Sequence, residues 1–206
     1  LRDVIQIRYD FSPAEPSLAI ENSQVGFKLS GVLLDIDLSL SYYYGYDDVP
    51  RPEAIWSVPS DDLTIVDAAV TITYPRMHVF GFDFTTSIPY LGVGFWGEMA
   101  LFLHDDLYTQ IYVDPITLPG TSQSISFDPT FYNELPASWF IKATAGMDYT
   151  FTRWLYANVQ YVYGFFDEFG RENLNHFLVP GVDIKMLDER LLLRLFAVLE
   201  LNHLAE

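Results

Sequence analysis

Apolar and polar residues alternate with a period of two along most of this chain. Between positions 5 and 11, Ile5, Ile7, Tyr9 and Phe11 are apolar, whereas the three residues between them are polar. Successive side chains of a β-strand point to opposite faces, so this pattern predicts a strand with one apolar and one polar face. The same alternation recurs in eight further segments: 25–30, 36–44, 80–85, 93–103, 141–151, 155–163, 182–186 and 191–199. We therefore expect an all-β protein.

The last eight of these segments pair in sequence order into four hairpins. Tight turns of a few residues join the strands within a hairpin, whereas the other connections are long and cover 12–23, 45–77, 104–138 and 165–176. The segment 191–199 leaves an alternative open, because its leucines also fit helical spacing and Leu, Arg and Glu favour helices. The neighbouring strands favour a strand here.

Short turns at one end and long loops at the other are typical of outer-membrane β-barrels. In a soluble sandwich, both ends would carry comparable loops and the inward residues would fall in mixed registers. The longest uncharged stretch, 84–97, has 14 residues and contains Pro89, whereas a spanning helix needs about 20 apolar residues. A membrane strand needs only about 9 to 11 residues. The sequence therefore predicts an antiparallel transmembrane β-barrel with long acidic loops on one side.

The segment 63–74 also alternates, with Ala68, Val70 and Ile72 apolar. If it crossed the membrane, the connection 104–138 would fall on the short-turn side. We therefore expect it to pair within the outer loop, which leaves nine crossings and about ten strands in all. The odd count, and a final Glu206 where such barrels typically end in an aromatic residue, favour a single barrel domain over 1–206 that is part of a larger barrel.

Aromatic residues make up 17% of the chain and gather where the expected strands meet the loops. The clusters are Tyr42 to Tyr46, Trp139, Trp154 and Tyr163 to Phe166. Tyr and Trp concentrate at both membrane interfaces, so these clusters favour a membrane protein. The alternative is ordinary packing of aromatic side chains on a sheet.

The composition excludes several classes of function. The chain has 28 acidic and 11 basic residues, a net charge of −17, and no cysteine. Nucleic-acid binding is excluded, because neutralising phosphates needs clustered Lys and Arg. Without cysteine there are no disulfides, thiolate zinc sites or cysteine nucleophiles, which fits a bacterial envelope protein.

Most of the excess negative charge lies in the long connections. Counting only 45–62 of the second connection, they hold fifteen acids against Arg51 and Arg171. Such loops would repel anions and concentrate cations, and adjacent carboxylates suit Ca²⁺. The candidate metal ligands are Asp47, Asp48, Asp105 and Asp106, with Asp61 and Asp62 as a third pair. The alternative is a solvated acidic surface that binds no ion.

The polar faces of the strands supply the candidate lining of a lumen. These residues are Tyr43, Asp83, Trp96, Glu98, Lys142, Asp148, Tyr156, Asn158, Gln160, Asp183 and Lys185. Rings, amides and carboxylates of this kind suit sugar-like or aromatic solutes. The alternative is structural, in which charges of both signs pair across neighbouring strands. Glu98 lies mid-strand, and we expect Lys142 on the next strand to be its cationic partner.

Several phrases of the sequence resemble a known family. The run YPRMHVFGFDFTTSIPYLGVGFWGEMALF, at 74–102, is similar to the Tyr-Pro entry, turn and Gly-Glu strand of a porin-like family of Gram-negative outer-membrane proteins without assigned function. The phrases ENSQVGFKLSG, DLSLSYYYGYDDVP and AGMDYTFTRWLYANVQYVYG are similar to strands and loops of such barrels. The resemblance implies an integral barrel of the bacterial outer membrane, in contact with the lipid bilayer and lipopolysaccharide.

No catalytic arrangement emerges from the sequence, and we expect no enzyme. His104, beside Asp105 and Asp106, is the best candidate base, but neighbours on a strand point to opposite faces and no serine lies in the motif. No strand offers two histidines at i and i+2 for a metal. The expected function is passage of small solutes with a preference for cations. The alternative is a non-conducting structural or adhesion barrel whose loops bind a partner.

Overall fold

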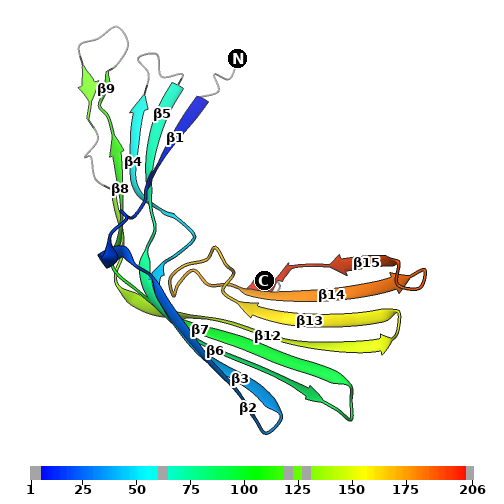
Figure 1. Ribbon diagram of the computed structural model, residues 1–206. Helices are drawn as coiled ribbons and strands as arrows, with labels where there is room; N and C mark the ends of the chain where they lie inside the picture. Colours follow the sequence, from blue (N-terminus) through cyan, green and yellow to red (C-terminus); the bar gives the residue numbers. More distant parts are fainter. Residues whose placement is uncertain (1–5, 60–64, 118–122, 127–130, 203–206) are drawn as a thin grey trace, which may run out of the picture. The chain divides into compact units, whose positions relative to one another are not determined.

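The computed structural model describes residues 6–59, 65–117, 123–126 and 131–202. Within these residues the protein is all-β, as predicted, and the one helical element is a 3-10 turn, η1 (Ile20–Asn22). None of the helical structure described is long and apolar enough to cross a membrane. The chain forms two compact units, which are described separately (Figure 1).

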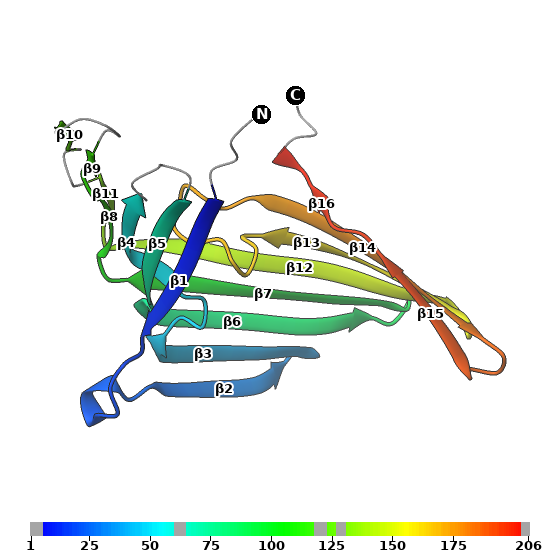
Figure 2. The same ribbon diagram turned by 90° about the horizontal axis from the view of Figure 1, so that it is seen from above.

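The second unit contains one long sheet of nine strands. In the order β15-β14-β13-β12-β7-β6-β3-β2, eight strands follow one another, and the short β16 pairs with β14 (Figure 2). Their bounds are β2 (Val25–Leu33), β3 (Ile36–Tyr46), β6 (Arg76–Ile88), β7 (Val93–His104), β12 (Ser138–Thr152), β13 (Leu155–Tyr163), β14 (His176–Met186), β15 (Leu191–Phe196) and β16 (Leu199–Glu200). The four predicted hairpins are therefore present, and the segment that also fitted a helix forms strands.

The hairpin turns of the long sheet lie together at one end (Figure 2). Leu34 and Asp35 both have positive φ, of 53° and 62°, between β2 and β3. Two successive residues in this region form the tight turn whose twist matches that of paired strands. Gly92 (φ 64°) closes the β6–β7 turn, where its N–H donates to the Ile88 carbonyl at 2.9 Å. Local turn chemistry thus fixes the strand register.

The first unit is built around a five-stranded sheet with the order β1-β5-β4-β8-β11. The bounds are β1 (Gln6–Ala14), β4 (Arg51–Pro59), β5 (Ile65–Thr73), β8 (Leu107–Val113) and β11 (Phe131–Leu135), and a separate pair is formed by β9 (Ile116–Thr117) and β10 (Ser124–Ile125). The pairs β1–β5 and β4–β8 are parallel, and Ala68 and Val70 of β5 are buried.

Two expectations about the strands are wrong. The strand predicted at 5–11 was counted as a membrane crossing, yet β1 pairs with β5 outside the long sheet, so eight long strands replace nine. The segments 45–77 and 104–138 were predicted as loops with one strand at 63–74, yet they also contain β4, β8 and β11. Alternation is the same in either sheet, and only non-local pairing decides which sheet a strand joins. The predicted strand within 63–74 is present as β5 and lies outside the long sheet.

The long sheet does not close into a barrel within the described residues, because β2 and β15 are its two edges. Every residue of β2 and of β15 is exposed. The single barrel domain over 1–206 and the larger barrel therefore stay predictions.

Candidate functional site

The long sheet gathers polar side chains on one side, which we call the polar face. Paired residues of antiparallel strands share a face. The registers place Asp148 opposite Asn158 and Tyr156 opposite Asp183. Between β7 and β12, a Cβ at Gly146 would lie 2.4 Å from the Trp96 ring, so these residues share the face as well.

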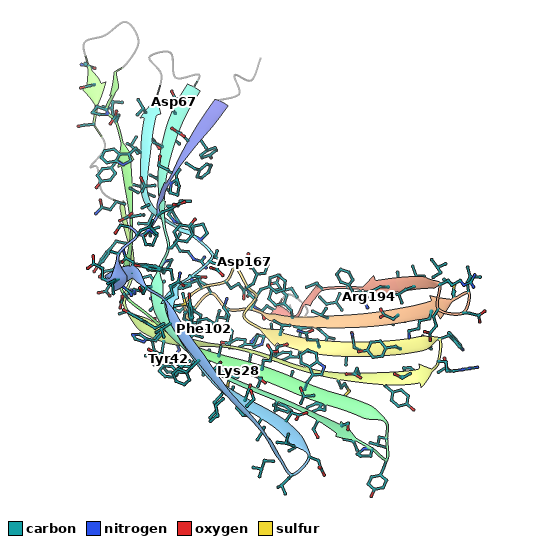
Figure 3. The ribbon with its side chains drawn as sticks, in the orientation of Figure 1. Lys28, Tyr42, Asp67, Phe102, Asp167 and Arg194 are labelled. Carbon is teal, nitrogen blue, oxygen red and sulfur yellow. The ribbon has the colours of Figure 1, made fainter. Side chains whose placement is uncertain are left out.

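All eleven predicted lumen residues lie on this face: Tyr43, Asp83, Trp96, Glu98, Lys142, Asp148, Tyr156, Asn158, Gln160, Asp183 and Lys185. The strands bring them together from β3, β6, β7, β12, β13 and β14. Whether the face lines a lumen stays a prediction. Figure 3 shows Tyr42 on the opposite side of the sheet from Lys28, Phe102 and Arg194.

The opposite side, which we call the apolar face, carries large apolar side chains that the described residues leave uncovered. Phe27 is 66% exposed, Leu29 71% and Leu195 55%. Further members with more than a third of their surface exposed are Val25, Leu40, Phe80, Phe95, Met99, Leu103, Met147, Tyr149, Tyr161, Leu191 and Leu193. The set spans the sheet from β2 to β15.

Two ion pairs cross between strands of the polar face. Lys28 Nζ lies 2.8 Å from Asp83 Oδ2, which also accepts a hydrogen bond from Ser39 Oγ. Arg194 donates from Nε and a terminal nitrogen to the two carboxylate oxygens of Asp183, both at 2.8 Å. The structural alternative, cross-strand pairing, therefore applies to these charges. It leaves the other polar residues of the face available for a lining role.

A cavity of about 470 Å³ lies over the middle of the polar face. Its polar wall includes Asp83, Glu98, Lys142, Thr144 and Gln160. Gln160 Nε2 donates to Thr144 Oγ1 at 2.8 Å, and Thr144 Oγ1 donates to the Tyr161 carbonyl at 3.0 Å. The wall is thus fixed by internal hydrogen bonds, while the exposed Glu98 presents a carboxylate.

Lys142 contacts backbone carbonyl oxygens rather than Glu98, its expected partner. Lys142 Nζ donates to the carbonyl oxygens of Phe165 at 2.6 Å and Phe166 at 3.2 Å, both in the β13–β14 connection. That connection therefore reaches the polar face, although the sequence predicted an outer loop. Its aromatic residues also line the cavity. In the sequence, the signal that could have indicated this contact was the run of aromatic residues in a charged loop.

Glu168 organises the same connection. Its carboxylate accepts hydrogen bonds from the Phe165 N–H at 2.8 Å, the Asn175 N–H at 3.0 Å and the Asn175 side-chain amide at 2.6 Å. Partial burial opposes ionisation, but these hydrogen bonds and the nearby Lys142 ammonium outweigh it. The pKa of Glu168 is consequently lowered below its usual range.

The predicted metal ligands lie in the first unit, and two of them accept hydrogen bonds from backbone N–H groups. Asp47 Oδ1 accepts from the Val49 N–H at 3.1 Å, and Asp106 Oδ1 accepts from the Ala137 N–H at 2.6 Å. In the described part of the chain, none of Asp47, Asp48, Asp105 and Asp106 belongs to a group of three or more His, Asp or Glu side chains that could hold a metal ion. Asp61 and Asp62 lie outside the described residues.

His104, the best candidate base in the sequence, makes a backbone contact with the next residue. The side chain is buried, and Nδ1 lies 2.8 Å from the backbone carbonyl oxygen of Asp105. A hydrogen bond of this kind orients the imidazole ring.

Aromatic rings and histidines gather near the loop end of the apolar face. His78 stacks on Tyr44, with ring centroids 4.4 Å apart, and its Nδ1 lies 2.9 Å from the Tyr42 hydroxyl. His176 repeats the arrangement on β14, stacked on Tyr163 at 4.8 Å. Near the turn end, the exposed rings are Tyr90, Tyr149, Phe151 and Trp154. Both ends of the sheet therefore carry aromatic side chains.

The chain matches no protein-family model, no curated protein and no solved structure. The resemblance to porin-like barrels therefore stays a prediction from the sequence.

Proposed function

We propose that the long sheet is part of the wall of a transmembrane β-barrel in a bacterial outer membrane. In this arrangement the apolar face meets lipid, and the polar face lines a path for small solutes that favours cations. The observation that carries the proposal is the uncovered apolar face, with Phe27, Leu29 and Leu195 each more than half exposed. Soluble monomers rarely expose contiguous apolar patches larger than a few hundred Å².

The strand lengths fit a bilayer. The strand β7 has 12 residues and β12 has 15. At about 3.3 Å per residue and a tilt of about 40°, twelve residues cover roughly 30 Å along the membrane normal, against an apolar band about 25 Å tall. The aromatic side chains near both ends of the sheet then fall at the two interfaces, where such rings are enriched.

The two edge strands of the long sheet, β2 and β15, need further strands to pair with them in a bilayer. Unpaired backbone N–H and C=O groups cost several kcal/mol each in hydrocarbon, so a sheet in a bilayer must close. We propose that additional strands pair with β2 and β15 and complete a larger barrel.

Unpaired carboxylates on the polar face support the preference for cations. Glu98 and Asp148 make no ion pair with any described residue, whereas Lys28 and Arg194 are each paired with an aspartate. Negative side chains along a water-filled path raise the local concentration of cations and repel anions. The net charge of −17 acts in the same direction.

A second candidate is a non-conducting adhesion or structural barrel whose five-stranded sheet binds a partner. It is favoured by the folded five-stranded sheet of the first unit, where Trp56 stacks on Tyr112 with centroids 3.8 Å apart and stays 46% exposed. Exposed aromatic surfaces are frequent at interfaces.

Folding into lipid vesicles tests the proposed function. The full chain should insert into vesicles, show a strand-dominated circular dichroism spectrum, migrate differently on gels before and after heating, and resist extraction at alkaline pH. A vesicle-swelling assay with small sugars should then detect passage. A water-soluble monomer would refute the membrane proposal, and inserted protein without passage would favour the second candidate.

A further inference from the structure

The connection between β13 and β14, residues 164–175, folds back onto the polar face of its own sheet. Gly164 begins it with φ 80°, a conformation that favours glycine, and its N–H donates to the Asn175 carbonyl at 3.0 Å. This hydrogen bond closes the base of the connection. Figure 3 shows Asp167 on the side of the sheet that carries Phe102. We call residues 164–175 the inner loop.

Aromatic packing holds the inner loop against the wall. Phe169 of the loop packs edge-on against Phe140 of β12, with centroids 5.1 Å apart, and Phe140 stacks on Phe102 of β7 at 4.9 Å. Phe140 is 1% exposed and Phe169 7%, so both are among the few buried apolar residues of the described chain. Burial of these rings removes apolar surface from water and so stabilises the loop against the wall.

Lys142 adds an anchor from the wall to the loop backbone. Its ammonium donates to the Phe165 and Phe166 carbonyl oxygens and lies 5.8 Å from the centre of the Phe102 ring. A Cβ at Gly164 would approach Lys142 Cγ to 2.7 Å, so glycine allows the chain to pass close to the lysine stem. Glu168 makes the loop rigid by joining its two ends through Phe165 and Asn175.

We infer that the inner loop is a fixed constriction of the solute path, and that Lys142 is the positioning residue that holds it. The inference rests on the proposed function. Phe165 and Phe166 of the loop line the 470 Å³ cavity together with Asp83, Glu98 and Gln160 of the sheet. A solute that moves along this part of the polar face meets the loop beside the carboxylates of Asp83 and Glu98. The loop therefore sets the size limit of the path at its carboxylate-lined part.

The test compares Lys142→Met with Lys185→Met in the full chain folded into vesicles. Both variants remove one positive charge from the polar face, but Lys185 pairs with Glu189, 3.5 Å away beside the β14–β15 turn. Trypsin cleavage after Arg171 reports loop release without any need for conduction. In Lys142→Met, this cleavage should accelerate about tenfold or more, because hydrogen bonds from a charged group are lost. Sugars larger than the wild-type limit should also enter the vesicles.

Further variants keep the test decisive. Lys142→Arg retains the charge and the donors and should behave like the wild type. If Lys142→Met does not fold, Phe169→Ala removes the packing on Phe140 without changing a strand. It should accelerate cleavage after Arg171 and raise the size limit in the same way. Lys185→Met should leave the rate of cleavage after Arg171 as in the wild type.

The outcomes separate the inference from the proposed function. Unchanged cleavage at Arg171 in Lys142→Met would overturn the anchoring role. Faster cleavage with an unchanged size limit would overturn the constriction while leaving passage intact. A wild-type protein that inserts but passes no sugar would refute the proposed function and the constriction together, whatever the protease shows.

Discussion

Replacing Met99 by arginine probes which face of β7 meets lipid. Met99 lies on the apolar face and is 46% exposed. It is six residues from Val93, about 20 Å along the strand and roughly 15 Å deep at a tilt of about 40°, close to the middle of a 25 Å apolar band. Arginine on the lipid face near the midplane costs about 2–4 kcal/mol. This corresponds to a loss of roughly 30- to 1000-fold in the folding equilibrium.

Urea titration of the protein in lipid vesicles measures the effect. With a urea dependence of about 2 kcal/mol per M, the midpoint should fall by about 1–2 M. The matched control is Glu98→Arg, one residue away on the polar face, where Glu98 forms no ion pair with a described residue. Its midpoint should change by less than about 0.5 M, although this substitution reverses a charge. Equal losses in the two variants would refute the facing of β7 and the composition of the polar face.

Three further predictions concern the polar face and its loop. The pKa of Glu168 is lowered, so its stabilising contribution is present above the usual glutamate pKa of about 4.3 and is lost as the pH falls through the pKa of the folded state. Acidification should therefore speed opening of the inner loop, measured by hydrogen exchange, and Glu168→Gln should remove that pH dependence. Gly146→Val should displace the Trp96 ring, destabilise the sheet by about 1–3 kcal/mol and change the near-ultraviolet circular dichroism spectrum. Asp183→Asn should weaken the bidentate pair with Arg194 and lower the urea midpoint by less than Met99→Arg does.

The four hairpins of the long sheet were predictable because their signals are local. Alternation assigns each side chain to a face, and tight turns such as Leu34–Asp35 fix the register of the two strands they join. The polar face followed from the same pattern, since a one-residue shift would move its whole set of side chains to the apolar face.

The first unit and the inner loop were not predictable in the same way. The strand β1 pairs with β5, about sixty residues later in the chain, in a parallel arrangement that no local turn encodes. The contact of Lys142 with Phe165 joins a strand to a loop through backbone carbonyls, which every residue carries. Alternation predicts neither the strand pairing nor the loop position, because both depend on non-local contacts.

The reversal potential of the protein in a planar bilayer with a salt gradient tests the account most directly. It depends on insertion, on an open path and on the sign of the charges that line it. We predict a conducting path whose reversal potential shifts toward the equilibrium potential of the cation, and a smaller shift in Glu98→Gln. Preference for anions, or no conductance from protein that has inserted, would contradict the account.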